Sequence, residues 1–140
     1  MSDRFFLDTN IFVYSYDWSA TRKANIAEQL IGKALVSRKG VVSFQVIQEF
    51  FNVSLKRFSP AMSLTEAEEF LSTVFRPLLS VHSSANLYSE ALRLYGRNGL
   101  SWYDSLIVSS AIIANCDVLY SEDMQHGQRF GNLQILNPFL

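Results

Sequence analysis

Four acidic residues stand where apolar segments end or helices begin, and together they could carry out metal-dependent chemistry. They are Asp8, Glu49, Asp104 and Asp123. Carboxylates that lie close together raise each other's pKa unless a cation lies between them. Mg²⁺ takes oxygen ligands from a few carboxylates and keeps several waters, often beside substrate phosphates. The four acids therefore predict a metal site that acts on phosphate.

Three of these acids are predicted to meet at one edge of a parallel sheet. Asp8 follows the apolar run 5–7 and Asp123 follows the apolar run 117–120, so both lie at the carboxyl ends of predicted strands. Ligands collect at that edge of open parallel sheets. Asp104 lies in the first turn of a long apolar helix, and the N-terminus of this helix is expected to face the same crevice.

Two of the acids also have a purely structural interpretation. Asp8 could simply cap the helix that follows its strand, although Thr9 and Asn10 add a hydroxyl and an amide that could orient water or phosphate. Asp104 lies three residues after Ser101, which is close to capping-box spacing, and an acid in the first turn favours the helix dipole. For Asp104 the structural interpretation and the ligand interpretation are compatible.

Glu49 lies on a polar stripe of a helix predicted to extend to about Arg57. The stripe consists of Gln45, Glu49, Asn52 and Lys56. Its members are spaced by four, three and four residues beside an apolar face, so they share one side of the helix. The stripe is either a solvated surface or the wall of a cleft, with Glu49 as a ligand and the other residues touching substrate.

The segment 121–123 offers two acids, of which one is needed at the site. Asp123 is the predicted site residue, and Glu122 is predicted to be a solvated neighbour. His126 lies three residues further on and is predicted to be a loop histidine without a role. The single cysteine, Cys116, is predicted to be a small buried apolar residue, because it follows an alanine-rich helix.

Length and composition predict one globular domain that spans residues 1–140. The net charge of −1 provides no strong field for nucleic acid, so such a partner would need metal ions and a local basic patch. The candidate cations for phosphate contacts are Arg22, Lys23, Lys56, Arg93 and Arg97. No signal peptide or membrane-spanning pattern is visible, and a soluble cytoplasmic protein is expected.

Short apolar strands alternate with amphipathic helices along the chain. This alternation predicts an α/β fold in which a parallel sheet is covered by helices on both faces. Strands are predicted at 5–7, 41–42, 78–81, 117–120 and 133–136. The N-caps of the helices are predicted at Thr9 or Asn10, Ser19 or Thr21, Ser43, Ser63, Ser83 or Ser84, and Ser101. Pro77 is predicted to end the helix that begins at Ser63.

The acidic motifs taken in order resemble the PIN-domain family. The motifs are Leu7-Asp8-Thr9-Asn10, Gln48-Glu49-Phe50, Trp102-Tyr103-Asp104-Ser105-Leu106-Ile107 and Ser121-Glu122-Asp123. In particular the chain looks like the single-domain PIN ribonucleases that are toxins of bacterial type II toxin–antitoxin pairs. The resemblance covers nearly the whole chain and implies an α/β/α sandwich with a central parallel sheet.

The same resemblance implies an activity and its site residues. It maps acidic ligands of Mg²⁺ or Mn²⁺ onto Asp8, Glu49, Asp104 and Asp123, and supporting residues onto Asn10 and Ser121. It implies a metal-dependent endoribonuclease with an RNA substrate and a cognate antitoxin. The apolar surplus and the aromatic residues of the chain leave room for a homodimer or for a groove that binds the antitoxin. Two alternatives remain open: a PIN-like module without catalysis that contacts protein or RNA, and a haloacid-dehalogenase-type phosphatase. The phosphatase family has a second aspartate where this chain has Asn10.

Overall fold

A single sheet forms the centre of the molecule. The structure is a computed structural model and describes residues 2–140, within which the sheet has six strands in the order β3-β2-β1-β4-β6-β5. The strands are β1 (Phe5–Leu7), β2 (Gly40–Ser43), β3 (Leu79–Val81), β4 (Val118–Tyr120), β5 (Arg129–Phe130) and β6 (Leu133–Leu136). All neighbouring strands are parallel except β5 and β6. The predicted α/β architecture is confirmed, and the short antiparallel edge strand β5 was not predicted.

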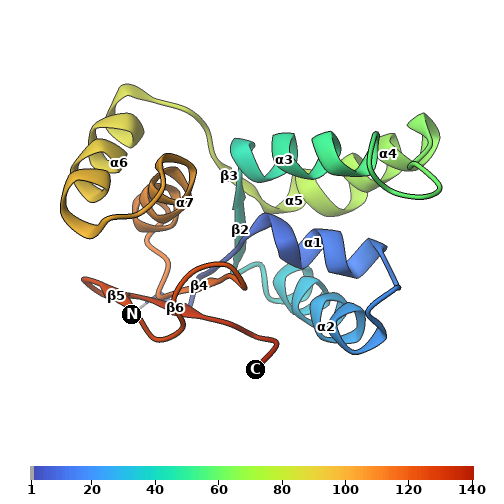
Figure 1. Ribbon diagram of the computed structural model, residues 1–140, viewed down its shortest axis with the longest axis horizontal. Coiled ribbons are helices and arrows are strands. Elements are labelled where there is room, and N and C mark those ends of the chain that lie inside the picture. Colours follow the sequence, from blue (N-terminus) through green and yellow to red (C-terminus); the bar gives the residue numbers. More distant parts are fainter. Residues whose placement is uncertain (1) are drawn as a thin grey trace.

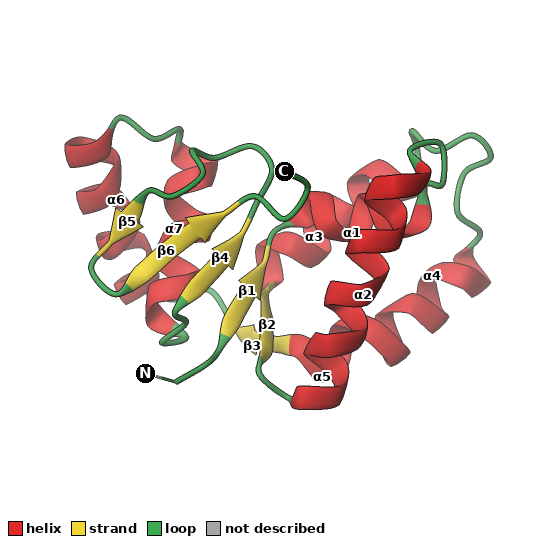
Figure 2. Cartoon of the chain, turned by 90° about the horizontal axis from the view of Figure 1, so that it is seen from below, coloured by secondary structure: helices red, strands yellow, loops and turns green. Residues whose placement is uncertain are grey.

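Helices cover both faces of this sheet, as the alternating pattern predicts. They are α1 (Thr9–Tyr16), α2 (Thr21–Ser37), α3 (Phe44–Ser54), α4 (Leu64–Phe70), the π-helix η1 (Leu71–Phe75), α5 (Arg76–Leu78), α6 (Ala85–Asn98) and α7 (Trp102–Ile113). Figure 1 shows the pair α6 and α7 on one side of the strands and the pair α1 and α2 on the other. In Figure 2 the arrows of β1, β4 and β6 point the same way, so their carboxyl ends share one edge.

Two predicted helices differ from the structure at their ends. The helix predicted to continue to about Arg57 ends at Ser54, and turns follow. Pro77 does not end the helix that begins after Ser63, because η1 and α5 continue it and Pro77 lies in the first turn of α5. The helical backbone extends only one residue past Pro77, to Leu78, before β3 begins at Leu79.

The N-caps of α1 and α2 separate the predicted alternatives. Asp8 caps α1, as its structural interpretation allows, and Thr9 and Asn10 do not; the Asp8 carboxylate accepts a hydrogen bond from the Thr9 N–H. The residue before α2 is Ala20, whose side chain makes no capping hydrogen bond. The first of these differences matters for function, because the cap of α1 is also the acid that the sequence places at the candidate site.

A cluster of phenylalanines holds α3 against α1 and η1. Phe50 of α3 stacks on Phe70 with ring centroids 4.8 Å apart, and Phe12 of α1 lies 4.8 Å from Phe75. Phe12, Phe50 and Phe75 are fully buried. Each buried phenylalanine contributes about 1.5–3 kcal/mol relative to an exposed one. The polar side of α3, which carries Glu49, is therefore held in a fixed position relative to α1.

Gly40 allows α2 to pack closely on β2. A Cβ atom at Gly40 would lie 2.1 Å from the Cβ atom of Ala34 in α2, so a larger residue would push the helix away from the sheet.

Cys116 is buried, as predicted, and burial raises the pKa of its thiol to about 12.

Candidate active site

A cleft at the carboxyl ends of β1 and β4 brings the four predicted acids together. We call it the acid cleft, and its volume is about 510 Å³. Its lining residues are Asp8, Thr9, Asn10, Val13, Tyr14, Glu49, Asn52, Val53, Tyr103, Asp104, Ile107, Glu122 and Asp123. The acids come from four separate segments of the chain, and the parallel sheet with its helices brings these segments to one place.

Asp8 is the most buried of these acids, with 6% of its surface exposed. One carboxylate oxygen accepts a hydrogen bond from the Thr9 N–H at 2.7 Å, and the other accepts one from the Ser121 hydroxyl at 2.8 Å. Burial raises the pKa of Asp8 from 3.8 to about 7, against these hydrogen bonds, and the charges of Glu49 and Asp123 raise it further. Ser121 is buried beneath Asp8 and orients its carboxylate.

Glu49 is oriented by two neighbours. The Thr9 hydroxyl donates a hydrogen bond to one of its oxygens at 2.6 Å, and the Gln45 amide nitrogen lies 3.3 Å from the other. Gln45 is buried, with 4% of its surface exposed. Glu49 and Asn52 line the acid cleft, which favours the cleft-wall interpretation of the polar stripe; Lys56 lies beyond the end of α3 and is not part of the lining.

Asp104 and Asp123 complete the acidic wall. Asp104 follows the N-cap Ser101 of α7, whose hydroxyl accepts a hydrogen bond from the Asp104 N–H at 3.1 Å. Burial raises the pKa of Asp104 above its ordinary value, the Ser101 hydroxyl opposes this, and the charges of Asp123 and Glu49 add to it. Asp123 is exposed, and one of its oxygens accepts a hydrogen bond from the Asn10 amide at 3.2 Å.

The expectation that Glu122 is a solvated neighbour is wrong. Glu122 is partly buried, forms an ion pair with Lys23 of α2 and accepts a hydrogen bond from the Tyr14 hydroxyl at 2.5 Å. Burial raises its pKa, but the hydrogen bonds from Lys23 and Tyr14 outweigh this and the pKa falls below its ordinary value. Lys23 and Tyr14 are about a hundred residues from Glu122 in sequence, so no local spacing could reveal this network.

Few of the predicted phosphate-binding cations are available to the acid cleft. Lys23 is paired with Glu122, and Arg93 is paired with Glu90 on α6. None of the described residues that line the acid cleft is a lysine or an arginine. His126 also has a structural partner, because its Nδ1 atom accepts a hydrogen bond from the Asn137 N–H at 2.9 Å. The described lining of the cleft therefore offers a phosphate polar and acidic side chains but no basic one.

The donor chemistry of the acid cleft fits a hard divalent cation. Its candidate ligands are carboxylate and amide oxygens, and the Oδ1 atom of Asn10 is buried without a hydrogen-bond partner within residues 2–140. Across the same residues, no group of three or more His, Cys, Asp or Glu side chains is arranged to hold a metal ion as the side chains stand. The cleft thus fits a hydrated ion bound by a few carboxylates rather than a closed cage.

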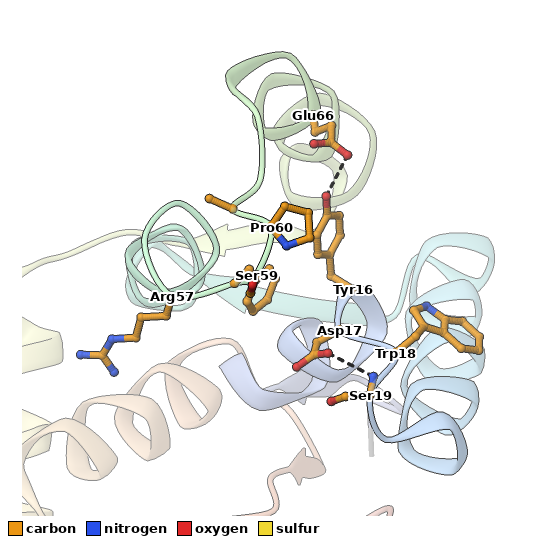
Figure 3. Close-up of a pocket in the computed structure, with 10 residues that line it drawn as sticks. Tyr16, Asp17, Trp18, Ser19, Arg57, Ser59, Pro60 and Glu66 are labelled. Carbon is orange, nitrogen blue, oxygen red and sulfur yellow. Dashed lines mark hydrogen bonds between the residues drawn. The ribbon is translucent and has the colours of Figure 1, made fainter.

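A second cavity of about 620 Å³ lies where the ends of α1 and α3 meet the start of α4 (Figure 3). We call it the helix-end cavity, and its lining residues are Tyr16, Asp17, Trp18, Ser19, Arg57, Phe58, Ser59, Pro60, Ala61 and Glu66. Its acids have local partners: Tyr16 donates to Glu66 at 2.8 Å, and Asp17 accepts from the Ser19 N–H at 3.1 Å. It contains none of the predicted site residues.

The sequence matches the model of the PIN domain over residues 5–129. The chain belongs to the PIN-domain family. The match includes all four acidic motifs and extends from β1 to the start of β5. It gives no support to the haloacid-dehalogenase alternative. The comparison with curated proteins found no significant match.

Solved structures with the same fold include proteins of toxin–antitoxin systems. A structure described as a toxin–antitoxin complex from Klebsiella pneumoniae is similar with a TM-score of 0.67 at 14% identity, over 95% of this chain and 96% of that one. Mycobacterium tuberculosis VapC20, described as a toxin that cleaves the sarcin–ricin loop, gives 0.61 at 20% identity over 85% and 89%. Rickettsia felis VapBC2, bound to a promoter DNA fragment, gives 0.58 at 23% identity over 94% and 96%. At these identities the likeness shows the PIN fold.

No helix between residues 2 and 140 is both long enough and apolar enough to cross a membrane.

Proposed function

We propose that this protein is a metal-dependent endoribonuclease that hydrolyses RNA phosphodiester bonds. The observation that carries the proposal is the acid cleft, in which Asp8, Glu49, Asp104 and Asp123 line one wall. Burial and like charge raise the pKa of Asp8 and of Asp104, so the apo cleft is electrostatically unfavourable. Unfavourable clusters of this kind mark functional sites, and a bound cation would relieve the repulsion.

The four acids would hold Mg²⁺ or Mn²⁺, directly or through water. When bound, such an ion lowers the pKa of water and offsets the charge that develops on a phosphate. The chain's own contribution is orientation. Ser121 and the Thr9 N–H fix Asp8, the Thr9 hydroxyl fixes Glu49, and Asn10 fixes Asp123. Asn10 and Ser121 are therefore supporting residues, and no histidine or cysteine nucleophile is needed.

The proposal extends to a toxin whose activity is controlled by an antitoxin. One of the similar structures is described as a toxin–antitoxin complex and covers 95% of this chain, and a second is described as a toxin and covers 85%. The whole length of this chain, residues 1–140, would then act as one PIN domain whose partner is an antitoxin. Inhibition would require a segment that reaches the acid cleft.

We include a homodimer in the same proposal. Tyr88, Leu92 and Tyr95 are exposed on α6 at spacings of four and three residues, so they form one apolar row on the outer side of that helix. A row of this kind favours contact with a second copy. Sedimentation of the purified protein tests the dimer, and Leu92→Asp is expected to shift a dimer toward monomer while the helix remains folded.

Cleavage assays with defined metal content test the enzymatic part of the proposal. The purified chain is expected to cut RNA with Mn²⁺ or Mg²⁺ and to lose this activity in EDTA. Asp117→Asn is a matched control, because Asp117 lies at the opposite end of β4 and binds the Asp3 N–H at 2.8 Å. This variant should cut like wild type. Undiminished cleavage in EDTA by protein free of contaminating nuclease would contradict the metal dependence, and failure to cut any RNA with Mn²⁺ would favour the module without catalysis.

Growth of an expressing bacterium tests the toxin part separately. Induction of the wild-type chain alone is expected to arrest growth, and Asp8→Asn is expected to relieve the arrest at equal protein level. If the wild-type protein cuts RNA in vitro but leaves growth unchanged, the toxin role fails and a housekeeping nuclease remains.

A further inference from the structure

The acid cleft has one large exposed aromatic ring beside its carboxylates. Tyr103 has 64% of its surface exposed and lines the cleft next to Asp104. The other tyrosine of the lining, Tyr14, is less exposed, and its hydroxyl is bonded to Glu122. An exposed ring on a protein surface is common by itself, so its meaning depends on what surrounds it.

The surroundings of Tyr103 tie its position to the acids. Gln45 donates through one amide nitrogen to the Tyr103 carbonyl oxygen and to Glu49, each at 3.3 Å. Gln45 is buried on α3, and its Oε1 atom has no partner among the described residues. The same buried amide thus fixes one acid of the cleft and the backbone that carries the exposed ring.

The charge of the cleft limits how a nucleic acid can be held there. The lining includes five acids, Asp8, Glu49, Asp104, Glu122 and Asp123, and among its described residues no lysine or arginine. Proteins usually gain affinity for nucleic acid from basic contacts to phosphates. Beside metal ions and the polar side chains of the lining, stacking of a base on an aromatic ring is a further source of affinity, which contributes roughly 1–3 kcal/mol per base, or about 5- to 150-fold.

We propose that the Tyr103 ring is a stacking platform for an unpaired base next to the phosphate that is cut. This inference rests on the proposed RNA hydrolysis in the same cleft and adds a residue that positions the substrate beside the acids. A base within a duplex is stacked on its neighbours and cannot lie on a side-chain ring. Val53 and Ile107 add apolar side chains to the same lining.

A set of variants tests the platform with one single-stranded RNA that the wild type cuts in Mn²⁺. Tyr103→Phe keeps the ring and is expected to cut within twofold of wild type. Tyr103→Ala is expected to lower kcat/KM about 10-fold, mainly through KM, because stacking is lost from substrate and transition state alike. Trp18→Ala is the matched control: Trp18 is 46% exposed but lines the helix-end cavity, so this variant should behave like wild type.

RNA that lacks one base tests whether the loss of kcat/KM in Tyr103→Ala reflects lost stacking on that base. An abasic site beside the cut is expected to slow the wild type about as much as Tyr103→Ala does, and to slow Tyr103→Ala little further. The same sequence in a duplex is expected to resist cleavage. Equal kcat/KM for wild type and Tyr103→Ala, or equal cleavage of the duplex, would overturn the platform while leaving RNA hydrolysis intact.

Absence of cleavage by the wild type would instead defeat the proposed function, and binding then tests the platform alone. Fluorescence anisotropy of the same labelled RNA with Mn²⁺ is expected to show about 10-fold weaker binding by Tyr103→Ala than by Tyr103→Phe. Equal affinities of these two variants would overturn the platform. Circular dichroism should show the same melting temperature for both, because the ring is exposed.

Discussion

The acid cleft and the helix-end cavity are similar in size but differ in how their acids are stabilised. In the helix-end cavity Glu66 accepts a hydrogen bond from the Ser63 N–H at 2.9 Å and one from the Tyr16 hydroxyl at 2.8 Å. These bonds lower the pKa of Glu66, with the backbone bond as the largest cause. In the acid cleft burial raises the pKa of Asp8 to about 7 and also raises that of Asp104.

Cavity volume is therefore a poor guide to chemistry in this fold. The helix-end cavity is the larger of the two, at about 620 Å³ against about 510 Å³. Glu66 in that cavity nevertheless has a structural role, because Glu66 and Ser63 form the capping box that begins α4. The acids of the acid cleft destabilise the metal-free protein through burial and mutual repulsion, which is typical of functional sites.

Neutralising one acid in either cavity should give the largest difference between the two cavities, measured as RNA cleavage. Asp8→Asn and Asp104→Asn are each expected to lower RNA cleavage at least about 100-fold, since metal-assisted charge stabilisation amounts to several kcal/mol and each 1.4 kcal/mol is tenfold. Glu66→Gln is expected to cut within twofold of wild type. Kinetics at equal protein and Mn²⁺ concentrations measure both effects. Wild-type cleavage by Asp8→Asn would remove Asp8 from the active site.

The pH dependence of stability should have opposite signs in the two cavities. The pKa of Asp8 is raised in the folded state, so its carboxyl group ionises at lower pH in the unfolded chain than in the folded one. The metal-free protein therefore loses stability as pH rises from about 4 to about 7. A rise from 3.8 to about 7 corresponds to about 4 kcal/mol. Glu66 has a lowered pKa, so its contribution is lost as pH falls below its ordinary range.

Urea unfolding in EDTA checks this electrostatic contrast. Asp8→Asn is expected to be about 2–4 kcal/mol more stable than wild type at pH 8 and about equally stable at pH 4. Mn²⁺ is expected to raise the melting temperature of wild type and to have little effect on the variant. A variant that is less stable than wild type at pH 8 would show that the hydrogen bonds to Asp8 outweigh its burial.

Local sequence patterns predicted the fold and the meeting of the four acids in one cleft, for identifiable reasons. Asp8 and Asp123 each follow a short apolar strand, and the parallel arrangement of β1 and β4 brings such positions to one edge. Asp104 was found from its place in the first turn of an apolar helix. The sequence did not decide whether the polar stripe of α3 faces solvent or the cleft. Packing of Phe50 against the other phenylalanines turns the stripe toward the cleft.

Contacts between distant segments could not be predicted in the same way. The pairing of Glu122 with Lys23 depends on how α2 packs beside the loop after β4, and the acid alone looks like a solvated residue. The link from Gln45 to the Tyr103 carbonyl joins positions 58 residues apart. The edge strand β5 has two residues, which is too short to leave an alternating pattern.

The smallest expected effect concerns the cap that the helix-end cavity shares with α4. Ser63→Ala removes the hydroxyl that accepts the Glu66 N–H at 3.1 Å. Loss of an N-cap of this kind costs about 1 kcal/mol, and the variant should unfold at a correspondingly lower urea concentration. RNA cleavage should remain within twofold of wild type, because the acids of the other cleft are held by α1, α3 and α7 rather than by α4. A loss of cleavage that exceeds the loss of folded protein would show that the two cavities are coupled, most directly through Phe70 of α4, which stacks on Phe50 of the helix that carries Glu49.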